Sequence, residues 1–509
     1  MISSILQKIA RPDIAIIGCG PTGVMSLRHL HTVANVTAFE AKDDVGGVWY
    51  YTDLSEENHP NPESDPFYKV YGHLHSSLYD SLWTNVPKQM MTFKDFYHKE
   101  ETPHIMEAKT FHEYVKDYTR YFDLCKYIKF NTAVNSVRLL KNVSKEQKEK
   151  LGIPLDSQKK FLVSWITSKS PLSKGPLAGI DTSPQGESNM YETKKGFGLY
   201  DHVLFCNGHF SKMNWPKVEG QELFEGIQMH MHTLRKLEKD KFDNKRILIL
   251  GTHVSASDLL SLFFLRETAK EVQVGKVFIT GRSTDKLEKS TDYTEFMKSG
   301  ILTLKKGGLK RFKGGKIVEF VDGTEAEIDT VVYATGYHYS FPFLNEEDGI
   351  IEYDKEEPGA YFGPLYKRIF AIKEPDLLFI GVVEKVPLIQ GTYERQIMLA
   401  KQYIAGNIKI PSQEEMLKET ETELRKFEEN PKLGKQNFYK FSPFYTFWDY
   451  NDELVKMSGM EEDPSYRRLR PLVEATHQCT MNGNYWAKKL IDFAGLSKDI
   501  EFKPTASLF

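Results

Sequence analysis

Two segments of the chain combine an apolar strand pattern, a glycine-containing turn and a helical pattern, and these segments constrain the fold most. The first, at residues 13–40, contains DIAII, the turn GCGPTG, a helical stretch and then NVTAFE. The second begins at Arg246 with RILIL, continues through GTHVSASDLL and reaches the strand pattern KVFIT at 276–280. Apolar runs followed by glycine and helical spacing are typical of βαβ units. We therefore predict an α/β protein with two Rossmann-like dinucleotide-binding domains.

The order of the segments predicts that one domain is inserted into the other. The pattern TVVYATGY ends the second unit, and another buried strand pattern, DLLFIGVV, follows at 376–383. We expect residues 1–217 and 334–509 to form the first domain and residues 218–333 to form the inserted one. A C-terminal helical segment is part of the first domain in this scheme.

Polar stretches separate the predicted elements. Insertions at 141–190 interrupt a strand meander, and their Ser-, Pro- and Gly-rich piece at 168–190 is typical of disorder. Lys-rich and Gly-rich hairpins are expected at 301–328. The charged stretch from about residue 411 predicts an amphipathic helix with a solvent-exposed Lys/Glu face.

Composition argues against several classes of protein. Lys plus Arg is 67 and Asp plus Glu is 70, so the net charge of −3 gives no electrostatic reason to expect nucleic acid or an anionic membrane as a partner. The longest apolar patches, such as 259–265, fall short of the ~20 residues of a transmembrane helix. The N-terminal residues lack the pattern of a signal peptide. We expect a cytoplasmic protein, and a homo-oligomer is compatible with these features.

The four cysteines are Cys19, Cys125, Cys206 and Cys479, and no CxxC is present. This spacing excludes a dithiol redox pair as a local motif and argues against a disulfide framework. His230 and His232 lie two residues apart without further ligands arranged around them, so no metal site is expected.

The first turn has the spacing GxGxxG, with Gly18, Gly20 and Gly23 directly after a strand pattern. Such glycines allow a tight turn, close approach to a pyrophosphate, and helix–strand packing, while the helix N-terminus favours phosphate. Glu40 ends the next strand pattern, twenty residues after Gly20, where a carboxylate accepts hydrogen bonds from ribose hydroxyls. The turn therefore predicts a dinucleotide site.

The stretch DDVGGVWYY favours FAD over NAD as the first dinucleotide. Its glycine pair, Gly46 and Gly47, lets backbone pass close to the flavin half of the cofactor, with Trp49 packed nearby. The candidate FAD-binding residues are Gly18, Cys19, Gly20, Pro21, Thr22, Gly23, Glu40, Gly47, Val48 and Trp49.

The second turn carries His253 where a second glycine would normally lie. Its Cβ prevents the closest backbone approach to a phosphate. Gly251 still allows the tight turn, and the helix start at 255–258 still presents N–H groups to an anion. After the next strand, Arg282 occupies the position of a 2′-phosphate reader, although an exposed charge at a strand end is an equally ordinary interpretation. The candidate residues here are Gly251, Ser255, Ala256, Ser257, Asp258 and Arg282.

Taken together, these motifs resemble those of the flavin-containing monooxygenases. Four further stretches agree with that family: LYDSLWTNVPKQMMTFKDF at 78–96, FEGIQMHMHTL at 224–234, YATGYHYSFPFL at 333–344 and PLYKRIFAIKEPDLLFIGV at 364–382. Phe224, Gly226 and His230 match the pattern FxGxxxHxxx(Y/F), but Leu234 replaces its final aromatic residue. The second turn, with Ser255–Ala256, is similar to that of members resembling trimethylamine monooxygenase.

The resemblance implies an FAD- and NADPH-dependent enzyme that uses dioxygen through a flavin C4a-hydroperoxide and oxidises nitrogen or sulfur in small amines or thioethers. It implies a catalytic Asn85 at the flavin edge, with Thr84 near the cofactors, and further cofactor contacts from Thr335, Gly336 and Gln396. A Baeyer–Villiger monooxygenase, an uncoupled NADPH oxidase and a non-catalytic nucleotide-binding redox sensor are the alternatives.

Overall fold

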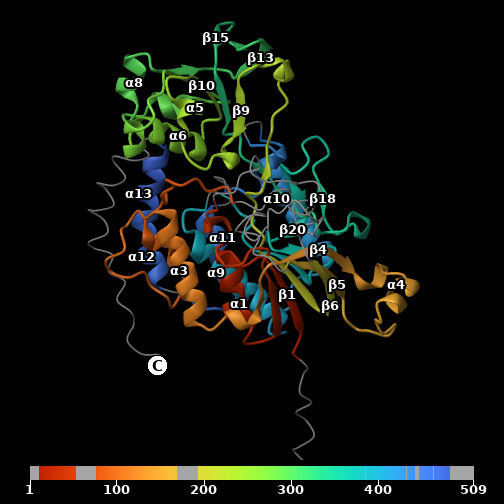
Figure 1. Ribbon diagram of the computed structural model, residues 1–509. Helices are drawn as coiled ribbons and strands as arrows, with labels where there is room; N and C mark the ends of the chain where they lie inside the picture. The colour runs from red at the N-terminus through yellow and green to blue at the C-terminus, as the bar shows by residue number, and fades with distance from the viewer. Residues whose placement is uncertain are drawn as a thin grey trace, which may run out of the picture.

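The computed structural model describes residues 11–52, 76–168, 193–384, 386–430, 433–441, 446–461 and 464–481. In these residues, two mainly parallel sheets with covering helices form two units. The host unit contains the first glycine turn and lies in the lower part of Figure 1, and the inserted unit contains the second and lies above it. Nearly all of the piece at 168–190 that we expected to be disordered lies outside the described residues.

The host unit is built on a seven-stranded sheet with the order β20-β21-β22-β7-β1-β2-β3. Its strands are β1 (Asp13–Ile17), β2 (Asn35–Phe39), β3 (Ile128–Lys129), β7 (His202–Phe205), β20 (Leu365–Tyr366), β21 (Phe370–Ala371) and β22 (Leu377–Phe379). Strand β1 pairs in parallel with β2 and β7. Its apolar residues are buried on both faces, as is usual for a parallel strand covered on two sides.

Each face of this sheet has its own cover. Helices α1 (Pro21–Leu30), α3 (Ala108–Tyr121) and α9 (Ile389–Ile404) pack on the face that contains Ile14 and Ile16. The opposite face, with Ala15 and Ile17, packs against the antiparallel sheet of β4 (Thr132–Leu139), β5 (Phe161–Ser168) and β6 (Thr193–Tyr200), and helix α4 (Lys145–Lys150) lies between β4 and β5 in sequence. The predicted meander is this second layer.

The inserted unit has a five-stranded parallel sheet with the order β12-β11-β10-β16-β9. Its strands are β9 (Ile227–His230), β10 (Arg246–Leu250), β11 (Lys276–Thr280), β12 (Leu302–Lys305) and β16 (Thr330–Tyr333). Its helices are α5 (Lys239–Phe242), α6 (Val254–Phe264), α7 (Asp285–Glu288) and α8 (Thr294–Lys298).

The expectation of hairpins throughout 301–328 was wrong at its beginning. Strand β12 is a parallel edge strand beside β11, and only β13 (Leu309–Gly314), β14 (Ile317–Phe320) and β15 (Glu325–Glu327) form an antiparallel hairpin sheet. Only Leu302 of β12 is buried, so this edge strand lacks the continuous apolar run that marks a buried parallel strand.

The two connections between the units run side by side. Strand β8 (Lys212–Met213) leads into the inserted unit and pairs antiparallel with β17 (Tyr337–His338), which leads back out. The Asn214 N–H donates to the Gly336 carbonyl at 2.9 Å, and the Thr335 hydroxyl donates to the Asn214 carbonyl at 2.5 Å. Thr335 and Gly336, two of the predicted cofactor contacts, therefore lie in this junction.

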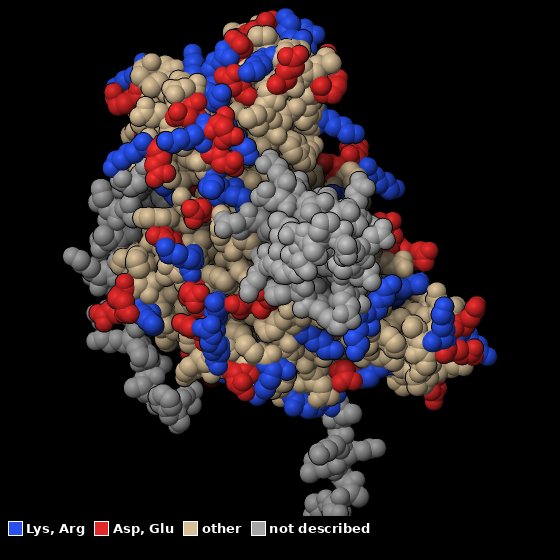
Figure 2. Space-filling view, in the orientation of Figure 1, with Lys and Arg blue, Asp and Glu red and all other residues tan. Residues whose placement is uncertain are grey.

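The C-terminal part is helical and packs on the host unit. It contains α10 (Gln413–Glu428), α11 (Phe447–Ser458), α12 (Pro464–Arg468) and α13 (Arg470–Met481), after the short strands β18 (Glu352–Tyr353) and β19 (Phe362–Gly363). Helix α10 begins at a capping box of Ser412 and Glu415, and only Met416, Thr420 and Phe427 are buried. In the described residues, no helix is long and apolar enough to cross a bilayer. Figure 2 shows both signs of charge interspersed over the described surface of the face drawn there.

Candidate active site

The first glycine turn has the geometry that its spacing predicts. Gly18 has a φ of +93°, which favours glycine, and its N–H donates to the Phe39 carbonyl at 2.8 Å. A Cβ on Gly23 would lie 1.9 Å from the Gly18 carbonyl oxygen, so no larger residue fits there. Pro21 occupies the first turn of α1, and no side chain of the described residues caps that helix at Gly20. An uncapped helix start of this kind is compatible with the predicted pyrophosphate site.

The predicted Gly46–Gly47 loop lies directly against this turn. A Cβ on Gly47 would lie 2.8 Å from the Cα of Gly20, and Gly47 itself has a φ of +57°. A Cβ on Gly46 would lie 2.5 Å from the His112 ring, whose Nε2 bonds the Val45 carbonyl at 2.8 Å. The two loops therefore pack backbone against backbone at Gly20 and Gly47, and a larger residue at Gly47 would push them apart.

Glu40 is buried beside the turn. One carboxylate oxygen accepts the Cys19 N–H at 2.7 Å, and the other accepts the Lys42 N–H at 3.0 Å. Burial raises the pKa of the Glu40 carboxyl, although the hydrogen bonds from Lys42 and Cys19 oppose this shift. A carboxylate has about four acceptor sites, so Glu40 can hold the turn and still accept a ribose hydroxyl.

The remaining candidates around the first turn differ in exposure. Val48 and Trp49 are partly exposed, and the Trp49 ring packs edge-on against Phe111 with centroids 4.8 Å apart. The Cys19 side chain is fully buried, so its contribution to the turn comes from its backbone. A Cβ on Gly381 would lie 3.0 Å from the Thr22 hydroxyl, so the loop after β22 contacts the start of α1.

The side chain of Gln396, which we expected to approach the flavin ring, is fully buried in α9. Its carbonyl oxygen accepts the Gly381 N–H at 2.9 Å, and its amide nitrogen donates to the Tyr450 hydroxyl at 2.7 Å. Both polar ends are therefore used within the protein, and Gln396 acts on the first turn by fixing Gly381. The sequence gives no signal for this because Gln396 and Tyr450 are 54 residues apart.

The second turn keeps one glycine for a clear steric reason. Gly251 has a φ of +121°, and a Cβ there would lie 2.2 Å from the Ala334 carbonyl oxygen. His253 is exposed, with a φ of −93° that any residue adopts, and it is the N-cap of α6. No side chain of the described residues caps α6. An uncapped helix start is compatible with the predicted anion site, and the Cβ of His253 is compatible with the looser fit that we expect there.

The four predicted residues of α6 divide into two pairs. Ser255 and Ala256 lie in the first turn, where their N–H groups face out of the helix end. The Ser257 N–H donates to the His253 carbonyl at 3.0 Å and is therefore part of the helix. Asp258 is 5% exposed, and its carboxylate accepts a hydrogen bond from the Tyr79 hydroxyl at 2.6 Å. Asp258 thus points into the protein, toward a residue that the sequence did not single out. Arg282 is exposed directly after β11, beside the turn, where Gly281 packs on Thr252.

The segment with Thr84 and Asn85 lies between the host and inserted units. The Thr84 N–H donates to the Met106 carbonyl at 2.8 Å, and its hydroxyl accepts the Met106 N–H at 3.1 Å. Thr84 is 1% exposed, so its side chain stabilises this loop, whereas Asn85 is partly exposed.

The histidines of the FxGxxxHxxx pattern have structural contacts. His230 is 1% exposed, and its Nδ1 accepts the His232 N–H at 3.0 Å. In the described residues, no group of three metal-ligating side chains is close enough to hold a metal ion. Leu234, the departure from the pattern, lies in the core of the inserted unit at 1% exposure, and an apolar residue suits that position.

Comparison with known proteins identifies the family. The family model described as flavin-binding monooxygenase-like (FMO-like) matches residues 11–160, 180–286 and 290–464. The chain belongs to this family. Its members are NADPH-dependent oxidoreductases that carry FAD, so the predicted family, enzyme class and pair of cofactors are confirmed.

Relatives of this flavin-binding monooxygenase-like protein agree along most of their length. FMO GS-OX3 from Arabidopsis thaliana is 27% identical over 481 residues, covering 91% of this chain and 90% of the relative. Trimethylamine monooxygenase from Methylocella silvestris is 27% identical over 417 residues, covering 79% and 76%. The solved structure of S-allyl-L-cysteine S-oxygenase from Allium sativum has a TM-score of 0.71 at 23% identity and covers 96% of this chain and 98% of its own. This likeness confirms the predicted fold class.

Proposed function

We propose that this flavin-binding monooxygenase-like protein is an N- or S-oxygenase of small amines or thioethers. In the proposed reaction NADPH supplies two electrons, one atom of dioxygen enters the substrate, and the other leaves as water. The observation that carries the proposal is the pair of glycine turns, each at the end of a parallel strand and each opening an uncapped helix, with Asn85 between the two units. The relatives named S-oxygenase, trimethylamine monooxygenase and senecionine N-oxygenase support this substrate class.

In this proposal the protein binds and orients the cofactors and the substrate, and it excludes water from the site. FAD, when bound, supplies electron acceptance from NADPH and activation of dioxygen. The first turn and Glu40 would hold the pyrophosphate and ribose of FAD, and the second turn and Arg282 would hold NADPH. Asn85 would act as the catalytic residue by donating an amide hydrogen bond at the flavin edge. The inserted NADPH domain would span residues 218–333, and residues 1–217 and 334–509 would form the FAD domain.

The test of the proposed activity is product analysis with the FAD-loaded protein, NADPH and oxygen. A tertiary amine, a thioether and a cyclic ketone are supplied separately, and products are compared with NADPH consumed. We expect an N-oxide or a sulfoxide. A lactone from the ketone would instead assign a Baeyer–Villiger monooxygenase, and peroxide as the only product would assign an NADPH oxidase. Nucleotide binding without sustained oxidation would assign a redox sensor.

Arg282→Ala is expected to weaken selection of NADPH over NADH. Loss of a charge-assisted hydrogen bond to the 2′-phosphate should raise the KM for NADPH about tenfold while leaving the KM for NADH unchanged. The measurement is steady-state kinetics with both nucleotides. Lys289→Ala, which removes another exposed positive charge of the same unit, is the matched control and should change neither KM. An unchanged ratio of the two KM values in Arg282→Ala would remove Arg282 from the nucleotide site.

A further inference from the structure

Residues 79–91 connect the cores of the two units. Tyr79 and Leu82 pack in the apolar core of the inserted unit, with residues of α6 and β10. A few positions later, Val86, Met90 and Met91 pack in the core of the host unit, with residues of α1 and α9. The segment therefore forms a third link between the units, in addition to β8 and β17, and its change of partner falls next to Asn85.

Polar contacts mark the same change of partner. On the inserted side, the Asp80 N–H donates to the Arg235 carbonyl at 2.7 Å, and Arg266 donates to the Ser81 carbonyl. On the host side, the Leu82 carbonyl accepts the Ala108 N–H at 2.9 Å. Together with the two bonds between Thr84 and Met106, this fixes the backbone from residue 82 onward to the host unit. Asn85 thus directly follows the residues that anchor the segment to the host unit.

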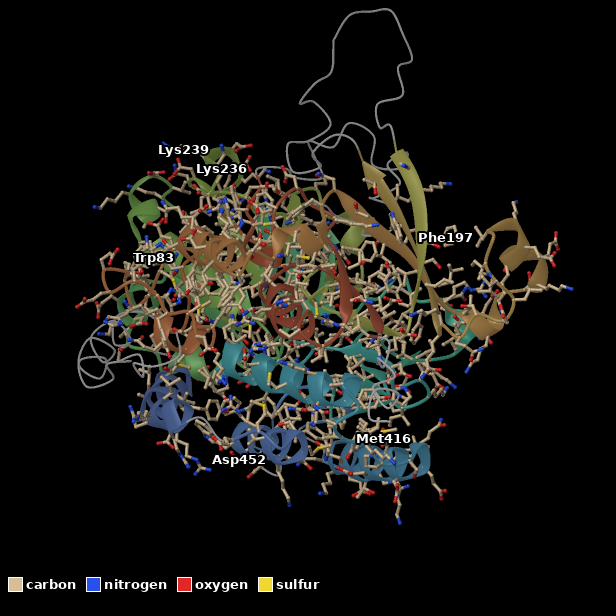
Figure 3. The ribbon with its side chains drawn as sticks, turned by 90° about the horizontal axis from the view of Figure 1, so that it is seen from below. Trp83, Phe197, Lys236, Lys239, Met416 and Asp452 are labelled. Carbon is tan, nitrogen blue, oxygen red and sulfur yellow. The ribbon has the colours of Figure 1, made fainter. Side chains whose placement is uncertain are left out.

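A buried side-chain hydrogen bond between Tyr79 and Asp258 attaches this segment to the inserted unit. Both residues are 5% exposed, and the Tyr79 hydroxyl donates to the carboxylate at 2.6 Å. Burial, and then the charge of Asp258, raise the pKa of Tyr79 well above its ordinary value, so the hydroxyl stays protonated and remains a donor. Arg266 lies 3.9 Å from the other oxygen of Asp258, and its guanidinium lies 5.8 Å from the centre of the Trp83 ring. Figure 3 shows Trp83 on the side of the molecule that also contains Lys236 and Lys239.

We propose that Tyr79 and Asp258 are positioning residues that attach the segment carrying Asn85 to helix α6, so that nucleotide binding at the N-terminus of α6 sets the position of Asn85. Asp258 lies five residues after the N-cap His253, within the same helix, so we expect the two positions to move together. Any adjustment of α6 toward a bound nucleotide is therefore passed to Tyr79 and along the short segment to Asn85. The inference rests on the proposed function, in which NADPH binds at the N-terminus of α6 and Asn85 lies at the edge of the flavin.

The test is hydrogen–deuterium exchange of the FAD-loaded protein with and without NADP⁺, combined with a fluorescence titration of NADP⁺. In the wild type we expect NADP⁺ to slow exchange in peptides covering residues 79–87. Tyr79→Phe should remove most of this protection because the hydrogen bond to a buried charge is worth about tenfold in an equilibrium. It should also lower the product formed per NADPH consumed, with the Kd of NADP⁺ changed less than about threefold, because the bond lies behind the nucleotide-binding turn.

Two further variants make the test specific. Asp258→Asn removes the charge from the same contact, and its effect should not add to that of Tyr79→Phe in the double variant. Tyr293→Phe is the matched control, because Tyr293 is also fully buried and donates to α6, at the Ser257 carbonyl at 3.1 Å, but lies within the inserted unit. It should leave both the protection and the product ratio unchanged.

The outcomes separate this inference from the proposed function. If the wild type binds NADP⁺ but Tyr79→Phe shows the same protection at 79–87, the inference is overturned and the proposed function stands. Equal losses in Tyr79→Phe and Tyr293→Phe would also overturn it, since they would indicate general loosening of α6. Failure of the wild type to bind NADP⁺ would overturn the proposed function and this inference with it.

Discussion

Asn85→Ala is expected to keep oxidising NADPH while losing most of the oxygenated product. Removal of one hydrogen-bond donor from a reacting centre typically costs about a hundredfold in rate. The close contacts of Gly18, Gly23 and Gly251 that shape the two turns are made with other residues, so we expect binding of FAD and NADPH to persist. The measurements are the rates of NADPH consumption, hydrogen peroxide release and product formation, all at the same oxygen concentration. Peroxide should rise until it accounts for nearly all of the NADPH consumed.

The control for this variant is Asn142→Ala, which removes an exposed asparagine that bonds Asp348 on the far layer of the host unit. Its product ratio should equal that of the wild type. If Asn85→Ala forms product as efficiently as the wild type, Asn85 has no role in the chemistry, and the segment at 84–85 serves only to join the two units.

Gly23→Ala is expected to yield a protein without flavin. The added methyl group would lie 1.9 Å from the Gly18 carbonyl oxygen, so helix α1 and the turn must move apart. That movement opens the cradle in which Gly20 contacts Gly47, and the first-turn N–H groups of α1 no longer converge on a pyrophosphate. The measurement is the absorbance ratio at 450 and 280 nm after reconstitution with excess FAD, alongside circular dichroism to establish that the variant folds.

Gly152→Ala provides the comparison for Gly23→Ala. Gly152 has a φ of +67°, which alanine adopts only with strain, but a Cβ there has no neighbour within 4 Å. This variant should lose about 1 kcal/mol of folding free energy and retain full flavin content. A Gly23→Ala protein with a full complement of FAD would contradict the assignment of the first turn as the FAD site.

The glycine turns were readable from the sequence because each follows a strand pattern and opens a helical pattern within a short segment. Only the requirement for Gly23 is local, since a Cβ there would meet the Gly18 carbonyl, whereas Gly18 and Gly251 are required by backbone of neighbouring strands that lie far away in sequence. The two βαβ units were recognised from the same patterns, whereas the order of the strands in each sheet was not predicted. The flanking acid was also readable, because Glu40 ends the strand next to β1 and therefore lies beside the turn.

Contacts between distant segments were not readable. Asp258 looked like a residue facing a nucleotide, but its partner Tyr79 is 179 positions away and nothing in either local pattern links them. Gln396 looked like a flavin contact for the same reason, since its partners lie in other helices and loops. Strand β12 was misassigned because the Lys- and Gly-rich composition of 301–328 gives no indication of which strand is the neighbour or of its direction.

The antiparallel pairing of β8 with β17 has a consequence for how such a chain could diversify. An inserted domain whose two ends are adjacent can be replaced without distorting the host domain. Here the two ends are adjacent, because Asn214 and Gly336 are hydrogen-bonded to each other. In a chimera that takes residues 214–336 from a relative with a different coenzyme, we expect both ends of the new segment to meet the ends of the host chain without rebuilding of the junction. Its success would then depend on whether the incoming helix offers a carboxylate to Tyr79.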